Sequence, residues 1–213
     1  MLFSLCANLS SAQPGLPYWN EIQSFKTTDS LHFPEKNQVL FIGSSSFRLW
    51  KDVNADFPGY KILNRAFGGA TLLDVIRYRY DVIYPYQPRQ IVLYCGENDF
   101  AASDTVTSEM VVSRLITLYK LIRDKYPTVP FVFVSIKPSP SRAHLQEKMA
   151  RANEQIRSFL QVERNAQFAD VYSAMLTSEG KIREDIFIED RLHMNKTGYT
   201  IWKKILKPFL KKR

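Results

Sequence analysis

The sequence predicts an α/β fold in which helices cover both faces of a parallel sheet of about five strands. Short apolar runs alternate with longer stretches of helical periodicity from residue 39 to the C-terminus. This alternation is typical of βαβ units, which place helices on both sides of a parallel sheet. With 213 residues, 45% of them hydrophobic and 23% charged, the chain has the size and composition of one medium globular domain.

Each predicted element is bounded by turn-forming residues or by a change of periodicity. The predicted strands are residues 39–42, 60–63, 90–94, 130–134 and 167–171. The predicted helices are residues 72–84, 108–125 and 145–162, with a last helix that begins near residue 196. In the helix over 108–125 the apolar side chains recur about every 3.6 residues, which predicts one buried face.

The N-terminal segment, residues 1–35, contains Pro14, Pro17 and Pro34. We expect it to wrap irregularly around the edge of a single domain that spans residues 36–213. Residues 1–12 are rich in apolar side chains and end in small residues, like the second half of a secretory signal. The basic residues that normally begin such a signal are missing from this segment. We expect export to the periplasm or the medium, and a cytoplasmic domain with an unstructured leader is the alternative.

The formal net charge is +8, and much of the excess lies near the C-terminus. The basic residues there are Lys203, Lys204, Lys207, Lys211, Lys212 and Arg213. A basic tail can bind nucleic acid or anionic lipid, but lysines also suit the negative end of a helix dipole. No nucleic-acid-binding motif accompanies them, so we expect a solvated helix end and no nucleic-acid partner. No apolar run approaches the roughly 18 residues of a membrane span, so stable membrane insertion is not expected.

The most informative segment is Gly43-Ser44-Ser45-Ser46, directly after the first predicted strand. Glycine permits a tight turn there, and open α/β sheets place ligands and chemistry at the carboxyl ends of their strands. A helix that starts at this turn offers free backbone N–H groups and the positive end of its dipole, which would stabilise a negative oxygen. Taken alone, however, the segment favours a plain serine cap for that helix.

Two further segments follow predicted strands. Gly68-Gly69 precedes a helix, where backbone amides can approach a ligand, although glycines also serve ordinary turns. Asn98, in Gly96-Glu97-Asn98-Asp99, carries a side-chain amide that can donate a hydrogen bond to an oxyanion. Asparagine and aspartate also favour polar turns, so neither segment is decisive by itself.

The fourth segment holds Asp190 and His193, just before the last predicted helix. An imidazole that accepts a proton from serine needs a carboxylate to fix its tautomer and to stabilise its charged form. Asp190 is three residues from His193, so one loop can hold both, whereas His32 and His144 have no acid at matching spacing. Because all four segments are predicted to converge on one edge of one sheet, the pair favours a nucleophilic serine over a helix cap.

In order and spacing, these four segments resemble the sequence blocks of the SGNH hydrolases, also called GDSL-type esterases and lipases. The resemblance covers residues 43–193 and implies a flavodoxin-like three-layer α/β/α sandwich. By position it implies Ser45 as nucleophile, His193 as base and Asp190 as acid. It also implies an oxyanion hole formed by the backbone N–H groups of Ser45 and Gly69 and the side chain of Asn98.

The chain departs from the family pattern at two places. Ser44 stands where block I often has aspartate, and Ala70 stands where block II often has aspartate. Neither change removes a group with an implied catalytic role, but both alter the surroundings of the nucleophile. With residues 135–140, the Gly-Ser-Ser-Ser form resembles a bacterial subgroup of GDSL-like proteins.

The resemblance implies a serine ester hydrolase that requires no metal and no organic cofactor. Two cysteines, Cys6 and Cys95, likewise provide neither a disulfide framework nor a metal cluster. No long lid insertion is present, which suggests an open site. If the protein is exported, we expect short-chain acyl esters such as O-acetylated carbohydrate as substrates. Candidate sugar-stacking side chains are Tyr78, Tyr80, Tyr84 and Tyr86, of which we expect at least half to be packing residues.

Three alternatives stay open at this point. One is activity of the lysophospholipase or lipase type on lipid esters. Another is a non-catalytic module that binds a sugar or phosphate at the same turns. A flavodoxin-like electron carrier is the third, although no acidic surface supports it. The Asp190 and His193 pair favours the enzyme, because an anion-binding site has no need of it.

Overall fold

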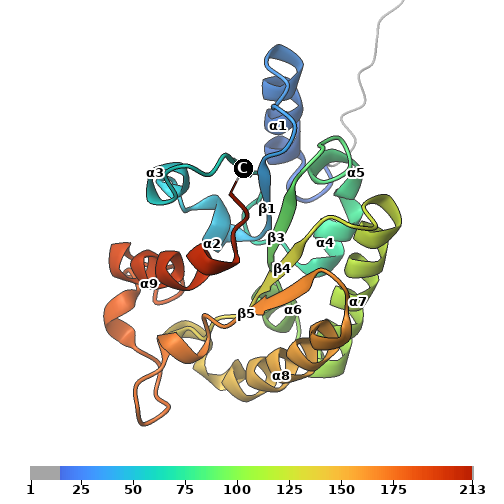
Figure 1. The fold of residues 1–213 in the computed structure, drawn as a ribbon. Coiled ribbons are helices and arrows are strands. Elements are labelled where there is room, and N and C mark those ends of the chain that lie inside the picture. Colours follow the sequence, from blue (N-terminus) through green and yellow to red (C-terminus); the bar gives the residue numbers. More distant parts are fainter. Residues whose placement is uncertain (1–14, 213) are drawn as a thin grey trace, which may run out of the picture.

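The computed structural model describes residues 15–212 as a three-layer α/β/α sandwich (Figure 1). The candidate export signal at residues 1–12 and Cys6 lie outside the described residues. No helix within the described part of the chain is long and apolar enough to cross a membrane.

The central sheet has five parallel strands in the order β2-β1-β3-β4-β5. Their bounds are Val39–Gly43 for β1, Ile62–Asn64 for β2, Gln90–Tyr94 for β3, Phe131–Val134 for β4 and Ala166–Ala169 for β5. The strand order changes direction between β1 and β3, so the connections that follow these two strands lead to opposite sides of the sheet. In open α/β sheets, such a switch point leaves a crevice at the carboxyl ends of the strands.

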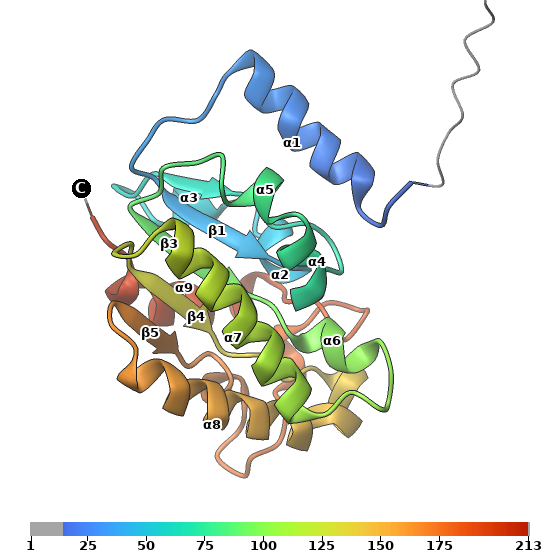
Figure 2. The same cartoon turned by 90° about the vertical axis from the view of Figure 1, so that its right-hand side faces the viewer.

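The helices form the two outer layers, with α2, α3 and α9 on one face and α4, α5, α7 and α8 on the other (Figures 1 and 2). The α-helices are α1 Trp19–Leu31, α2 Ser45–Arg48, α3 Val53–Asp56, α4 Leu72–Arg77, α5 Arg79–Val82, α6 Glu97–Ala101, α7 Ser108–Lys125, α8 Gln146–Val162 and α9 Lys196–Leu206. The 3-10 helices are η1 Pro140–Leu145, η2 Ser173–Met175, η3 Glu184–Ile186 and η4 Lys207–Phe209.

Successive side chains of the central strands enter two separate cores. In β1, Leu40 and Ile42 pack into the core beneath α4, α7 and α8, whereas Val39 and Phe41 pack into the core beneath α2 and α9. Because side chains of a strand alternate between faces, a strand covered on both sides is apolar at every position. This explains why the inner strands β1 and β4 are apolar throughout and fully buried. The predicted fold class is confirmed.

Two predictions about helices were wrong. Residues 19–31, expected to be irregular, form α1, and Pro17 and Pro34 flank this helix without interrupting it. The apolar periodicity of α1 is weak, and Ile22 is its only fully buried side chain. Polar contacts with distant residues, such as the Arg65–Asp29 ion pair, help to hold the helix. The predicted helix over 72–84 is two short helices, because the backbone at Tyr78 leaves helical geometry (φ −91°, ψ 12°).

Candidate active site

A sharp turn at the end of β1 brings the serines to the carboxyl edge of the sheet. Gly43 has φ 123°, and a Cβ atom there would lie 1.9 Å from the carbonyl oxygen of Tyr94 on the neighbouring strand. Only glycine fits this position. The Ser44 N–H donates to the same carbonyl oxygen at 2.9 Å, and α2 begins at the next residue, Ser45.

The three serines after this glycine have different surroundings. Ser44 and Ser46 are each 2% exposed, whereas Ser45 is only partly buried. Ser44 occupies the N-cap position of α2, but its side chain makes no capping hydrogen bond and its Oγ accepts instead from Asn98 Nδ2 at 2.7 Å. A capping role for this neighbouring serine side chain is therefore not observed.

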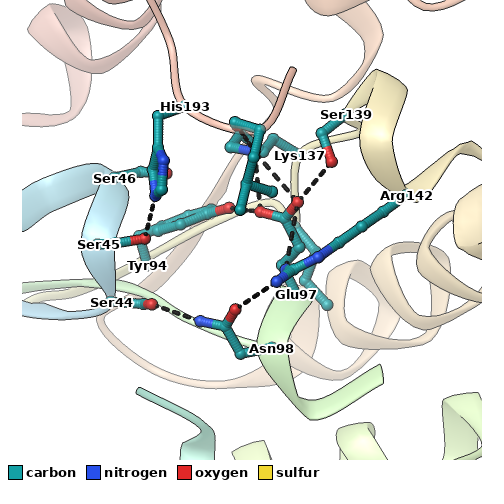
Figure 3. A network of polar contacts seen from close by, with 12 residues as sticks. Ser44, Ser45, Ser46, Tyr94, Glu97, Asn98, Lys137, Ser139, Arg142 and His193 are labelled. Carbon is teal, nitrogen blue, oxygen red and sulfur yellow. Dashed lines mark hydrogen bonds and ion pairs between the residues drawn. The ribbon is translucent and has the colours of Figure 1, made fainter. Parts of the chain in front are cut away.

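His193 lies on the side of Ser45 that faces away from Asn98 (Figure 3). Asp190 precedes it in the same loop before α9. His193 Nε2 is 2.9 Å from Ser45 Oγ, and its Nδ1 is 2.5 Å from Asp190 Oδ2. The other carboxylate oxygen, Asp190 Oδ1, accepts from the N–H groups of Leu192 at 2.9 Å and His193 at 2.8 Å. Aspartate, imidazole and hydroxyl thus form one continuous hydrogen-bonded chain.

The same contacts set the charge of Asp190. Partial burial raises the pKa of its carboxyl group, but the hydrogen bonds from the His193 N–H, the imidazole and the Leu192 N–H lower it by more. The pKa therefore lies below its ordinary value, and the carboxylate is ionised beside the imidazole.

Three hydrogen-bond donors are the candidates for the oxyanion hole. Within residues 15–212, the backbone N–H groups of Ser45 and Gly69 donate to no protein acceptor. Asn98 Oδ1 accepts from Arg142 Nη2 at 2.9 Å, and because a guanidinium only donates, this contact fixes which end of the amide is the nitrogen. Asn98 Nδ2 consequently points to Ser44 Oγ and to the carbonyl oxygen of Ala70, at 3.1 Å.

The start of α1 holds the glycine loop in place, a contact that the sequence analysis missed. Tyr18 Oη donates to the Gly69 carbonyl oxygen at 2.9 Å, and the Gly68 N–H donates to the Glu21 carboxylate at 3.2 Å. Arg48 of α2 pairs with the same carboxylate at 2.5 Å. Tyr18 and Gly69 are 51 positions apart, so no local sequence pattern could have indicated this contact.

Behind Asn98 lies a buried group of charged side chains that was also missed. Glu97 is 5% exposed and Lys137 is 0% exposed, and they form an ion pair at 2.9 Å. The sequence held one signal for it, because Lys137 follows the apolar residues of β4 after only two positions.

Other candidate residues lie elsewhere. His32 follows α1 and His144 lies in η1, and both are exposed. Tyr78 and Tyr86 are buried and cannot stack against a sugar, as expected for half of the tyrosines, while Tyr80 is 63% exposed. Across residues 15–212 no three His, Cys, Asp or Glu side chains form a group that could hold a metal ion.

Comparison with known proteins places this arrangement in a family. The model of the GDSL-like Lipase/Acylhydrolase family matches residues 43–201. Platelet-activating factor acetylhydrolase IB subunit alpha1 from Bos taurus is 27% identical over 76% of this chain and 70% of its own length.

Two solved structures share the fold. A GDSL-like lipase from Bacteroides thetaiotaomicron has a TM-score of 0.74 and 20% identity, over 88% of this chain and 96% of its own. A mutant acetyl-xylooligosaccharide esterase from Geobacillus has a TM-score of 0.65 and 15% identity, over 83% of this chain and 97% of its own. Because the family match extends over most of the chain, this protein belongs to the GDSL-like Lipase/Acylhydrolase family and is an ester hydrolase.

Proposed function

We propose that this hydrolase works through an acyl-enzyme formed on Ser45, with His193 as general base and Asp190 as the carboxylate that orients it. The observation that carries the proposal is the hydrogen-bonded chain from Asp190 through His193 to Ser45, with distances of 2.5 and 2.9 Å. A module that only binds an anion has no need of this chain.

In the first step, His193 Nε2 takes the proton of Ser45 as Oγ attacks the ester carbonyl carbon and forms a C–O bond. The tetrahedral intermediate then expels the alcohol, which receives that proton from His193. In the second step His193 takes a proton from water, the hydroxide attacks the acyl-enzyme, and the acid leaves as Ser45 regains its proton. Asp190 stabilises the imidazolium during both steps.

The oxyanion of each intermediate is proposed to bind the backbone N–H groups of Ser45 and Gly69 and the amide of Asn98. The two backbone donors need no rearrangement, because neither donates to a protein acceptor within the described residues. Asn98 Nδ2 donates to a hydroxyl and a carbonyl oxygen, and a charged oxyanion is a stronger acceptor than either. Loss of one such donor costs about 10²–10³ in kcat.

For the substrate we propose a short acyl group, with acetyl first, on a carbohydrate alcohol. The names of the Bos taurus relative and the Geobacillus structural neighbour both specify an acetyl group, although the alcohols differ. An acetylated lipid is the second candidate, which the name of the Bos taurus relative favours.

A graded series of acyl esters, run beside acetate release from acetylated glycans, tests both parts of the proposal. We expect a sharp preference for acetyl and a loss of at least about 10⁴-fold in kcat for Ser45→Ala. Activity that rises with acyl length would favour a lipid ester. Full activity of Ser45→Ala on p-nitrophenyl acetate would remove Ser45 as the nucleophile.

A further inference from the structure

A buried carboxylate lies behind the proposed oxyanion hole and is bonded on every side (Figure 3). Glu97 accepts from Tyr94 Oη at 2.8 Å, from Ser139 Oγ at 2.7 Å and from Lys137 Nζ, and it pairs with Arg142 Nη1 at 3.5 Å. These partners come from β3, from the segment after β4 and from η1. The carboxylate therefore joins three segments of the chain beneath the site.

One branch of this network leads to the loop that carries His193. Lys137 Nζ donates to the carbonyl oxygen of Leu192 at 2.7 Å. That oxygen belongs to the peptide unit whose N–H, on His193, donates to Asp190 Oδ1 at 2.8 Å. Both polar ends of the peptide unit preceding His193 are therefore held, one by Lys137 and the other by Asp190.

The other branch leads to Asn98. Arg142 Nη2 donates to Asn98 Oδ1 at 2.9 Å while its Nη1 faces Glu97. The guanidinium fixes the orientation of the amide, and its positive charge draws electron density towards Oδ1. Both effects make Asn98 Nδ2 a better donor to an oxyanion.

Stability alone does not explain these buried charges. The free energy needed to remove two charges from water offsets much of the attraction between them in a protein interior. Proteins in which apolar residues replace such a buried pair are often as stable. Burial raises the pKa of Glu97, but Lys137 and Arg142 lower it by more, while burial lowers the pKa of Lys137 against the opposing effect of Glu97. Two cationic side chains, Lys137 and Arg142, thus face this one carboxylate.

We propose that Glu97 is a positioning residue that, through Lys137 and Arg142, sets both the loop of His193 and the amide of Asn98. The inference rests on the functions proposed above for His193 and Asn98. In this arrangement the positions of the base His193 and of the oxyanion donor Asn98 both depend on the buried carboxylate of Glu97, which does not itself contact Ser45.

The branch through Asn98 is tested by a double-mutant cycle. Arg142→Met should lower kcat by about 10²-fold, because small displacements of a catalytic group cost about that much. KM should stay within about threefold, since ground-state binding is not affected. In an Asn98→Ala background the same change should cost less than about twofold, because the effect assigned to Arg142 on this branch passes through Asn98.

The branch through Lys137 is tested by the double variant Glu97→Gln with Lys137→Met. Changing both residues avoids leaving one unpaired charge in the interior, which a single change would do. We expect a cooperative thermal transition together with a kcat about 10²-fold below that of the unaltered protein and a KM within about threefold.

Gln90→Met is the matched control, because Gln90 is 0% exposed and binds the Phe209 carbonyl oxygen at 2.8 Å and the Lys211 N–H at 2.9 Å, at the start of β3 and so at the sheet edge opposite to Ser45. It should lower the melting temperature and leave kcat unchanged. An equal loss of kcat in this control would show general loosening and overturn the inference.

Two further results separate the inference from the function on which it rests. Unchanged kcat in folded Arg142→Met or in the Glu97/Lys137 double variant, beside an impaired Asn98→Ala, overturns the inference alone. Unchanged kcat in Asn98→Ala removes the proposed oxyanion hole, and the Asn98 branch of the inference with it.

Discussion

The hydroxyl groups of Ser44, Ser45 and Ser46 are chemically alike, and their positions in one turn separate their roles. Gly43 turns the chain so that Ser44 is buried against Asn98, whereas Ser45 is only partly buried and faces His193. Ser46 is buried again at the start of α2. At the site of the usual block I aspartate, Ser44 thus supplies a neutral acceptor for the Asn98 amide.

Asp190 has two tasks, and only an ionised carboxylate performs both. Its Oδ1 holds the loop backbone and its Oδ2 holds the imidazole. In Asp190→Asn the side-chain amide oxygen can still accept from the N–H groups of Leu192 and His193. The amide NH2 group then faces Nδ1 of His193 and favours the tautomer with its proton on Nε2, which cannot accept the proton of Ser45. We expect kcat to fall about 10⁴-fold with little change in melting temperature, measured by steady-state kinetics and thermal denaturation.

The control for this change is Asp185→Asn, in the preceding η3, whose carboxylate pairs only with Arg183 among the described side chains. It should keep wild-type kcat. Asp190→Asn activity within tenfold of wild type would contradict the role given to the carboxylate.

Helix α1 supports the candidate active site, although it lies outside the residues that the family model matches. Its first turn reaches the glycine loop through Tyr18 and Glu21. Tyr18→Phe removes the hydrogen bond to the Gly69 carbonyl oxygen and keeps the ring. We expect kcat to fall about 3- to 10-fold, the equivalent of one net hydrogen bond of about 1 kcal/mol, with KM nearly unchanged.

Tyr84→Phe is the matched control, because Tyr84 Oη also donates to a backbone carbonyl, that of Leu121, at 2.8 Å. It removes the same kind of bond between α7 and the segment after α5. Equal kcat losses in the two variants would show that the Tyr18 contact has no particular relation to the glycine loop.

The strands β1 and β4 were predictable because each is a run of apolar residues, and β3 has the predicted bounds. The rule that parallel strands end at one edge places Ser45 there, whereas Asp190 and His193 reach the same edge from the loop before α9. Helix α1 was not predictable, because its stabilising partners, such as Arg65, are distant in sequence. The Glu97 network was hidden for the same reason, since Lys137 and Leu192 are 55 positions apart.

At the scale of the whole molecule, acidic side chains with strong partners make the fold sensitive to acid. Partial burial raises the pKa of Asp170, but the Ser173 N–H at 3.0 Å and Arg157 at 2.6 Å lower it by more. The unfolded chain therefore takes up this proton at a higher pH than the folded chain. The stability that Asp170 contributes is present above the ordinary aspartate pKa of about 3.9 and is lost as the pH falls below it.

Urea denaturation near neutral pH and below the aspartate range tests this linkage. The wild-type protein should lose stability in acid, and Asp170→Asn should lose less between the same two conditions, because it has no carboxylate to protonate. An acid loss of the same size in both proteins would show that Asp170 does not contribute.

We propose Ser45, and neither neighbouring serine, as the nucleophile. The most direct measurement treats the folded protein with a fluorophosphonate and locates the adduct by tandem mass spectrometry, with His193→Ala as the control that lacks the base. We expect one adduct, on Ser45 Oγ, that forms far more slowly in the control. An adduct on Ser44 or Ser46, or no adduct on folded and ester-hydrolysing protein, would contradict it.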